Sequence, residues 1–209
     1  MNDCFPVGDR SVIDAAILAL LLSTEPSTAA PTTIQQVEIA PLFHQPFACI
    51  DHPEGQLSDP GDALGTDCFI VGGLRGPQSG LVRLFNGQGS RNEDWFSWRA
   101  EVHAPFDGTV TDIGVNPVSN KPGMGGKPPA SYITFRRSDG TVVVYAHVME
   151  IRVRKGDRVT SGQVVAVDGN NGTAKMPHVH VGAYRGSTAL QIRWDLRAEG
   201  HVPTLLGTK

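Results

Sequence analysis

Short apolar runs separated by turn residues make up most of this chain from residue 34 onward. Apolar and polar positions alternate in Gly108–Ile113, whereas Cys68–Val71 is a continuous apolar run that two glycines end. Alternation predicts a half-buried strand, and a short bounded apolar run predicts a fully buried one. Two β-branched segments, Ser131–Arg137 and Thr141–Val148, flank Ser138-Asp139-Gly140, which is typical of a hairpin turn.

The remaining pattern predicts further strands and almost no helix. Candidate strands cover Ile34–Ile39, Phe47–Ile50, Leu81–Phe85 and a last strand through Tyr184, and a single helical turn is expected at Trp194–Ala198. In Val153–Val167, β-branched residues are separated by turns at Lys155-Gly156-Asp157 and Ser161-Gly162-Gln163. The 24 glycines and 15 prolines favour many turns over long helices. The sequence therefore predicts a mainly β domain of antiparallel strands.

Residues 1–33 differ in composition from the rest of the chain. Val12–Leu22 is an apolar run that is too short to span a bilayer, and Ser23–Thr33 reads as a linker rich in Ser, Thr, Pro and Ala. The apolar run is either the core of a secretion signal or a short helix. We expect a β domain over 34–209, with its motif core at 92–184, and no transmembrane segment.

Charge and cysteine content narrow the classes of partner and site. The net charge of -3 and the lack of a dense basic patch argue against nucleic acid as a partner. Cys4, Cys49 and Cys68 show no CxxC spacing, so a thiolate zinc site is not expected. Cys49 and Cys68 form a disulfide if the protein is exported and are buried thiols if it is cytosolic.

A pair of histidines stands out in Pro177-His178-Val179-His180. In a strand, side chains two apart share a face, so both imidazoles project together while Val179 and Val181 face the core. By the same alternation His147 shares a face with Val143 and Tyr145, from which it can approach His178. Imidazole binds transition metals and serves as a general base near neutral pH.

Four motifs follow one another along the chain: Ala-Pro-x-x-Gly-x-Val at 104–110, Tyr145-Ala146-His147, Val-x-x-Gly-x-x-Val-x-x-Gly-Gln-x-x-Ala at 153–166 and Pro177-His-x-His180. In this order they resemble the motifs of the lysostaphin/LytM-type zinc endopeptidases. The resemblance implies a duplicated hybrid motif, also called a barrel-sandwich hybrid, and a divergent member of that family. It also implies cleavage of peptide cross-links in bacterial peptidoglycan, Zn²⁺ as cofactor and an extracytoplasmic location, periplasmic or secreted.

The resemblance also assigns candidate site residues. In this resemblance His180 stands at the position of a zinc ligand. His147 and His178 stand at the positions of the catalytic pair that activates water and stabilises the oxyanion. Asp67, directly before Cys68, stands where the family has an Asp ligand. Ala63 occupies the position of the upstream His ligand in many members, so Asp59 is the favoured third ligand, with Asp62 and His52 as alternatives.

Two other functions fit parts of the pattern. A degenerate homologue would bind or regulate at the cell wall without catalysis, as the missing upstream His suggests. Biotinyl and lipoyl carrier domains share the bent-strand glycine motifs but present a lysine at a hairpin tip. The tip here is Ser138-Asp139-Gly140, which disfavours a carrier.

Overall fold

The computed structural model describes residues 33–73 and 82–200 of the chain. The predicted apolar segment and linker at 1–33 fall almost wholly outside these residues and stay a prediction. Over the described part the chain is mainly β with mostly antiparallel pairing, which confirms the predicted fold class.

The described part contains twelve strands, one 3₁₀ turn and one short helix. The elements are β1 (Gln36–Ile39), β2 (Phe47–Asp51), β3 (Thr66–Ile70), η1 (Asn92–Asp94), β4 (Glu101–His103), β5 (Gly108–Gly114), β6 (Tyr132–Arg136), β7 (Val142–Ala146), β8 (Arg158–Val159), β9 (Val164–Val167), β10 (Val179–Arg185), β11 (Thr188–Ala189), β12 (Gln191–Trp194) and α1 (Leu196–Gly200).

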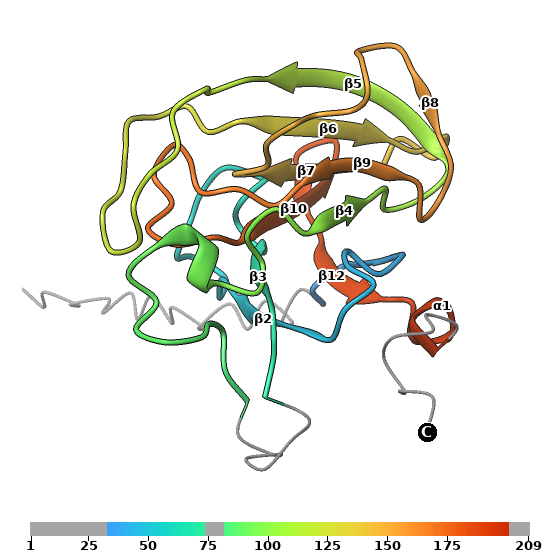
Figure 1. The fold of residues 1–209 in the computed structure, drawn as a ribbon. Helices are drawn as coiled ribbons and strands as arrows, with labels where there is room; N and C mark the ends of the chain where they lie inside the picture. The colour runs from blue at the N-terminus through green and yellow to red at the C-terminus, as the bar shows by residue number, and fades with distance from the viewer. Residues whose placement is uncertain (1–32, 74–81, 201–209) are drawn as a thin grey trace, which may run out of the picture. The chain divides into compact units, whose positions relative to one another are not determined.

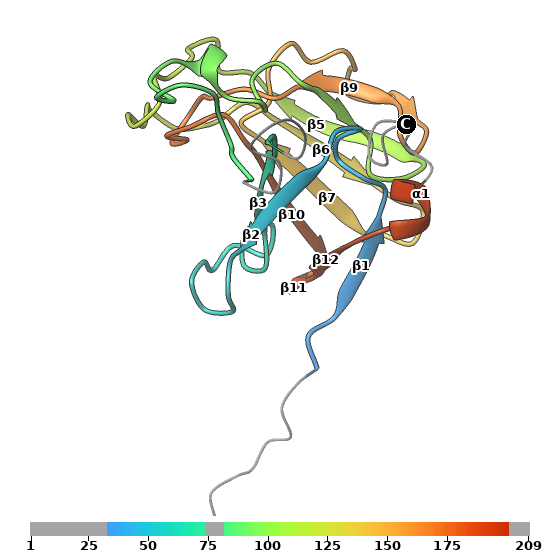
Figure 2. The ribbon, with the colours of Figure 1, turned by 60° about the horizontal axis from the view of Figure 1, so that its bottom comes forward.

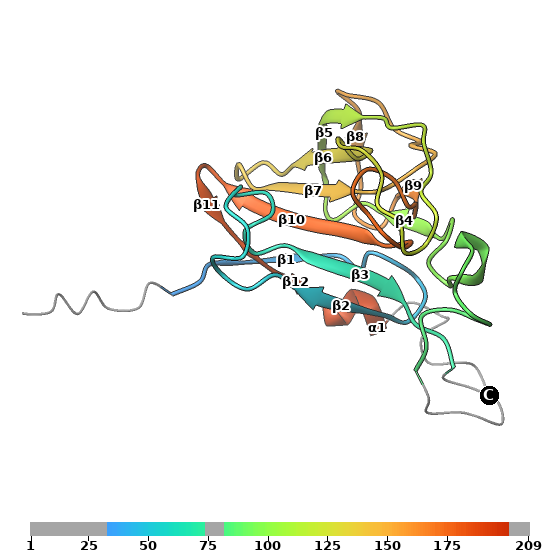
Figure 3. The same cartoon turned by 90° about the vertical axis from the view of Figure 1, so that its left-hand side faces the viewer.

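One large antiparallel sheet organises the fold (Figures 1 and 3). Its strands follow the order β2-β3-β10-β7-β6-β5-β8, and β11 pairs with β10 as an extension. The register sets His180 of β10 opposite both Asp67 of β3 and Ala146 of β7. Three segments distant in the sequence therefore meet at one end of the central strands.

Two smaller strand pairs lie against the large sheet and complete the core (Figures 1 and 2). β4 pairs with β9 in antiparallel fashion, whereas β1 and β12 run parallel. Alternate residues of the central strands form the inner face of the sheet and are fully or almost fully buried: Ile133, Phe135, Val143, Tyr145, Val181 and Ala183. The opposite face is more open, and it carries the candidate site.

Local pattern predicted most elements, with one exception. The hairpin between β6 and β7 is as expected, with Gly140 at a φ of 83° that suits glycine. The predicted strand at Leu81–Phe85 is wrong over its described residues, where only isolated bridges form, from Arg83 to Gly72 and from Phe85 to Trp95. Among the described residues, Arg83 and Phe85 bridge to two different segments, so the run does not pair continuously with one strand.

Cys49 and Cys68 form a disulfide. They lie directly opposite each other on β2 and β3. The bridge closes a loop with a sequence separation of 19 residues, and this loop contains the segment that enters the candidate site. It thus ties together the two strands that lead into and out of that segment.

Candidate metal centre and active site

His180 and Asp67 face each other across β10 and β3. Nδ1 of His180 lies 2.9 Å from Oδ1 of Asp67. The imidazole packs against Gly65, where a Cβ atom would come within 2.8 Å of the ring. A side chain at position 65 would therefore displace the ring.

His52 approaches the same carboxylate from the end of β2. Its backbone N–H donates to the Gly65 carbonyl, which continues the β2–β3 pairing by one residue. Ile50 lies opposite Asp67, so His52 is a diagonal neighbour on the same face. Nε2 of His52 lies 3.5 Å from Oδ1 of Asp67.

These three side chains make a donor set that fits zinc. Candidate ligand atoms of His52, Asp67 and His180 all lie within 4.8 Å of one another. Zinc takes nitrogen and oxygen ligands at about 2.0–2.1 Å in a tetrahedron, which separates the ligand atoms by about 3.3 Å. The 3.5 Å between His52 and Asp67 is close to that separation. Two imidazoles and a carboxylate also leave one tetrahedral position open.

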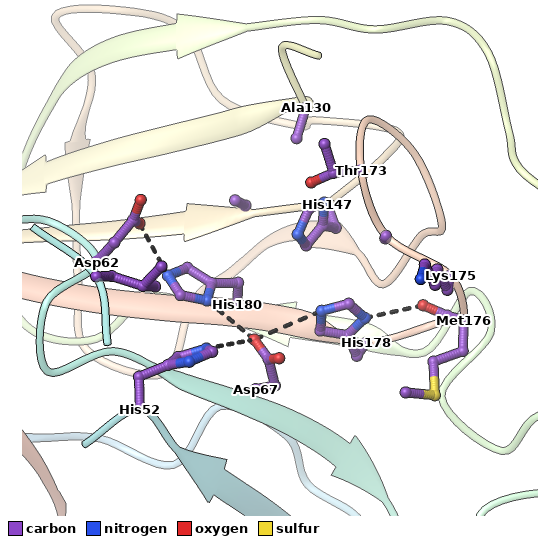
Figure 4. A pocket seen from close by; sticks show the side chains of 13 residues that line it. His52, Asp62, Asp67, Ala130, His147, Thr173, Lys175, Met176, His178 and His180 are labelled. Carbon is purple, nitrogen blue, oxygen red and sulfur yellow. Dashed lines mark hydrogen bonds and ion pairs between the residues drawn. The ribbon is translucent and has the colours of Figure 1, made fainter. Parts of the chain in front are cut away.

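Asp62 binds the other nitrogen of His180. Its Oδ1 lies 3.0 Å from Nε2 of the ring (Figure 4). Burial alone would lower the pKa of His180, but the hydrogen bonds to Asp62 and Asp67 outweigh burial and raise it to about 9. Burial also opposes ionisation of Asp67, yet its contacts with His178 and His180 hold the pKa of that carboxyl well below its usual range.

His147 and His178 form a second pair beside the donor set, with ring centroids 4.7 Å apart. Each ring places Nδ1 near a carbonyl oxygen, that of Asn171 for His147 at 2.9 Å and that of Met176 for His178 at 2.8 Å. A carbonyl can only accept, so Nδ1 carries the proton and the Nε2 lone pair is available in the neutral form.

The route by which His147 reaches the pocket differs from the predicted one. Val143 and Tyr145 face the buried core, so simple alternation would have turned His147 inward with them. Instead β7 ends at Ala146, and His147 adopts a φ of 65°. This left-handed conformation, uncommon for a residue other than glycine, turns the imidazole toward His178.

Asn171 holds His147 in that conformation. Its side-chain amide donates to the carbonyls of His147 (3.0 Å) and Val148 (2.9 Å), while its Oδ1 accepts the Ser131 N–H at 2.7 Å. The His147 ring in turn contacts the Asn171 carbonyl. Hydrogen bonds donated by each residue to the other therefore connect the loop after β9 to the end of β7. Burial and the neighbouring His178 lower the pKa of His147 to about 4, so this imidazole is neutral at pH 7.

The two groups share an open pocket of about 500 Å³. The three residues of the donor set and the two of the imidazole pair line it, together with Asp62 and the loop that leads to β10. Lys175 stands on that loop and is exposed. His178 and His180 both face the pocket while Val179 and Val181 are buried, as the alternation predicts.

Asp59 is not among the residues that the structure brings together at this group. Its Oδ1 accepts the backbone N–H of Gly61 at 2.8 Å, a local turn contact of the kind that Asp commonly makes. His52, an alternative in the sequence, lies in the group instead. One signal pointed to it: if Cys49 pairs with Cys68 across two strands, His52 must come close to Asp67.

Comparison with known proteins gives one family match and several similar structures. Residues 96–192 match the model of Peptidase family M23. The catalytic domain of lysostaphin from Staphylococcus simulans is 20% identical at a TM-score of 0.43, covering 69% of this chain and 88% of that one. SpoIIQ in complex with SpoIIIAH is 17% identical at 0.48, covering 73% and 96%. The comparison with curated proteins found no match.

A zinc-containing peptidase from Vibrio cholerae is 24% identical at a TM-score of 0.36. The alignment covers 44% of this chain and 25% of that chain, so the similarity extends over only a quarter of the V. cholerae protein. Likeness at these levels says nothing about the chemistry of the site.

The M23 match over residues 96–192 confirms the resemblance to the lysostaphin/LytM-type peptidases found in the sequence. The match supports a peptidase or cell-wall-related function and suggests zinc as the metal. Among the described residues, no helix is long and apolar enough to cross a membrane.

Proposed function

We propose that the protein is an extracytoplasmic zinc endopeptidase that cleaves peptide cross-links of bacterial peptidoglycan. The observation that carries the proposal is the convergence of the His52, Asp67 and His180 donors beside the imidazole pair of His147 and His178. In this proposal His52 takes the place of Asp59 as the third ligand. The M23 match supports the substrate class, peptides of the cell wall.

His52, Asp67 and His180 would hold the metal at the pocket that they line. When bound, zinc supplies a Lewis acid that polarises the scissile carbonyl and lowers the pKa of water. Asp62 keeps the Nε2 proton of His180 in place, which leaves Nδ1 to face the metal and Asp67. A carboxylate on the far nitrogen of a ligating imidazole fixes its tautomer and orientation.

His147 and His178 divide the proton chemistry according to their surroundings. His147 has its Nδ1 proton fixed on the Asn171 carbonyl, so its Nε2 can accept a proton from the attacking water. Nε2 of His178 lies 3.5 Å from Oδ1 of Asp67, beside the proposed donor set. From this position the imidazolium form of His178 can donate to the oxygen on which negative charge develops.

Metal content and hydrolysis, measured on one set of variants, test this proposal. We expect about one zinc per purified chain, lost in His180→Ala and in His52→Ala. Asp59→Ala is the matched control, because it removes a carboxylate from the same loop and should keep the zinc. His147→Ala should keep the zinc and lose hydrolysis of cross-linked cell-wall peptide.

The same measurements distinguish the active peptidase from the degenerate homologue that binds or regulates at the cell wall. A chain that binds zinc through His52 and His180 yet hydrolyses no cell-wall peptide would be the degenerate homologue. A chain that binds no zinc, or loses it in Asp59→Ala but not in His52→Ala, would contradict the proposed metal site.

A further inference from the structure

A second hollow lies on the large sheet away from the histidines. It is a groove of about 600 Å³ that is lined by residues of β5, β6 and β8 and of the turn between β6 and β7. Figure 1 shows where these strands lie in the fold. Three arginines, Arg136, Arg137 and Arg158, line it, and Asp107 is the one acidic residue among its lining residues. Hydroxyl groups of Thr109, Ser138 and Thr160 are also present.

Strand register aligns two of the arginines. Thr109 of β5 is paired with Arg136 of β6 on one side and with Arg158 of β8 on the other. Residues directly opposite each other on antiparallel strands point to the same face, so Arg136, Thr109 and Arg158 form one row. Both arginines are exposed, while Val110 and Val159, the next residues along, are buried on the other face.

The row is distinct from the proposed metal site. Along the sheet, His180 is level with Ala146 and Tyr132, whereas Tyr184 is level with Val142 and Arg136. The two levels are four residues apart on β10, which is about 13 Å along the strand. A ligand in the groove therefore need not touch the histidines.

Charge pairing distinguishes these two arginines from their neighbours. Arg137 binds Asp139 through two contacts, of 3.2 and 2.9 Å, and Arg185 binds the same carboxylate at 2.9 Å. Within the described part of the chain, Arg136 and Arg158 have no ion pair or side-chain hydrogen bond. Two unpaired guanidinium groups thus share one groove on a chain whose net charge is -3.

We propose that this groove binds a phosphate-bearing anion between Arg136 and Arg158. Guanidinium groups present planar forks of donors that match phosphate oxygens, and Thr109 places a hydroxyl between them. The four oxygens of a phosphate group, two or three of them unesterified, point to the corners of a tetrahedron and can meet two forks and a hydroxyl from different sides, whereas a carboxylate has two oxygens in one plane. The ligand is a phosphate monoester or a phosphodiester unit of a polymer.

Nuclear magnetic resonance of the full chain tests the site, because backbone amide signals report where an anion binds. Inorganic phosphate, titrated at constant ionic strength against chloride, should give saturable shifts at 107–110, 136–140 and 158–160. Arg136→Gln and Arg158→Gln should each weaken binding about tenfold, the loss expected for one charged hydrogen-bonding group. Arg154→Gln, which removes an exposed arginine just before β8, should leave the affinity within about twofold.

Three outcomes would overturn the proposal. They are the absence of saturable shifts in the groove, an equal loss of affinity in Arg154→Gln, and equal shifts with acetate at the same concentration. Glycerol 3-phosphate and glycerophosphoglycerol then distinguish the sources. Tighter binding of the first supports a phosphate monoester, and tighter binding of the second supports a phosphodiester polymer.

Discussion

Removal of the Cys49–Cys68 disulfide should destabilise the protein and loosen the proposed metal site. The bridge closes a loop with a sequence separation of 19 residues, and the chain-entropy relation gives about 3 kcal/mol for a loop of that length. For a domain of this size, 1 kcal/mol corresponds to roughly 2–4 °C. Cys49→Ala/Cys68→Ala should therefore lower the melting temperature by about 6–12 °C.

The same change should weaken zinc binding, because the loop contains two of the three proposed ligands. His52 lies three positions after Cys49, and Asp67 directly precedes Cys68. Without the bridge, more of the cost of ordering this loop falls on the binding of the metal. Both effects should therefore appear in one variant, measured by thermal and urea unfolding and by zinc titration.

Cys4→Ala supplies the matched control, since it removes the one cysteine outside the bridge. It should leave the melting temperature unchanged, and a reducing agent should destabilise it as much as it destabilises the parent chain. In urea without reductant, the parent should show a single reactive thiol. Three reactive thiols, or an unfolding free energy of the double variant within about 1 kcal/mol of the parent, would refute the reasoning.

Three further substitutions test the roles of single residues. Asp62→Asn should weaken zinc binding by about tenfold, measured by competition with a chelator, because the partner of the His180 Nε2 proton loses its charge. Asn171→Ala should cost about 2–3 kcal/mol in urea unfolding, since two buried carbonyls lose their donor, and should lower kcat more than it changes KM. Asp168 is buried, and its two carboxylate oxygens have no described hydrogen-bond partner. Burial raises the pKa of this carboxyl well above its usual range. At a pH above the pKa of the unfolded chain, folding therefore takes up a proton. The unfolding free energy should consequently fall as the pH rises above about 4, and Asp168→Asn should remove that slope and be more stable at pH 7.

The sequence determined the elements whose pattern is local. Alternation predicted the strands around the Ser138-Asp139-Gly140 turn, and it predicted that His178 and His180 would project together while Val179 and Val181 are buried. The side-chain period of two is a property of each strand alone, so it can be read without knowledge of the neighbours.

Tertiary structure decided which distant residues meet. His52 reaches Asp67 only through the register of β2 on β3, and Arg136 and Arg158 align only because both strands pair with β5. His147 turns into the pocket through a positive φ that Asn171, from a loop more than twenty residues away, holds in place. Register and such backbone conformations depend on contacts between remote segments, which a local pattern does not encode.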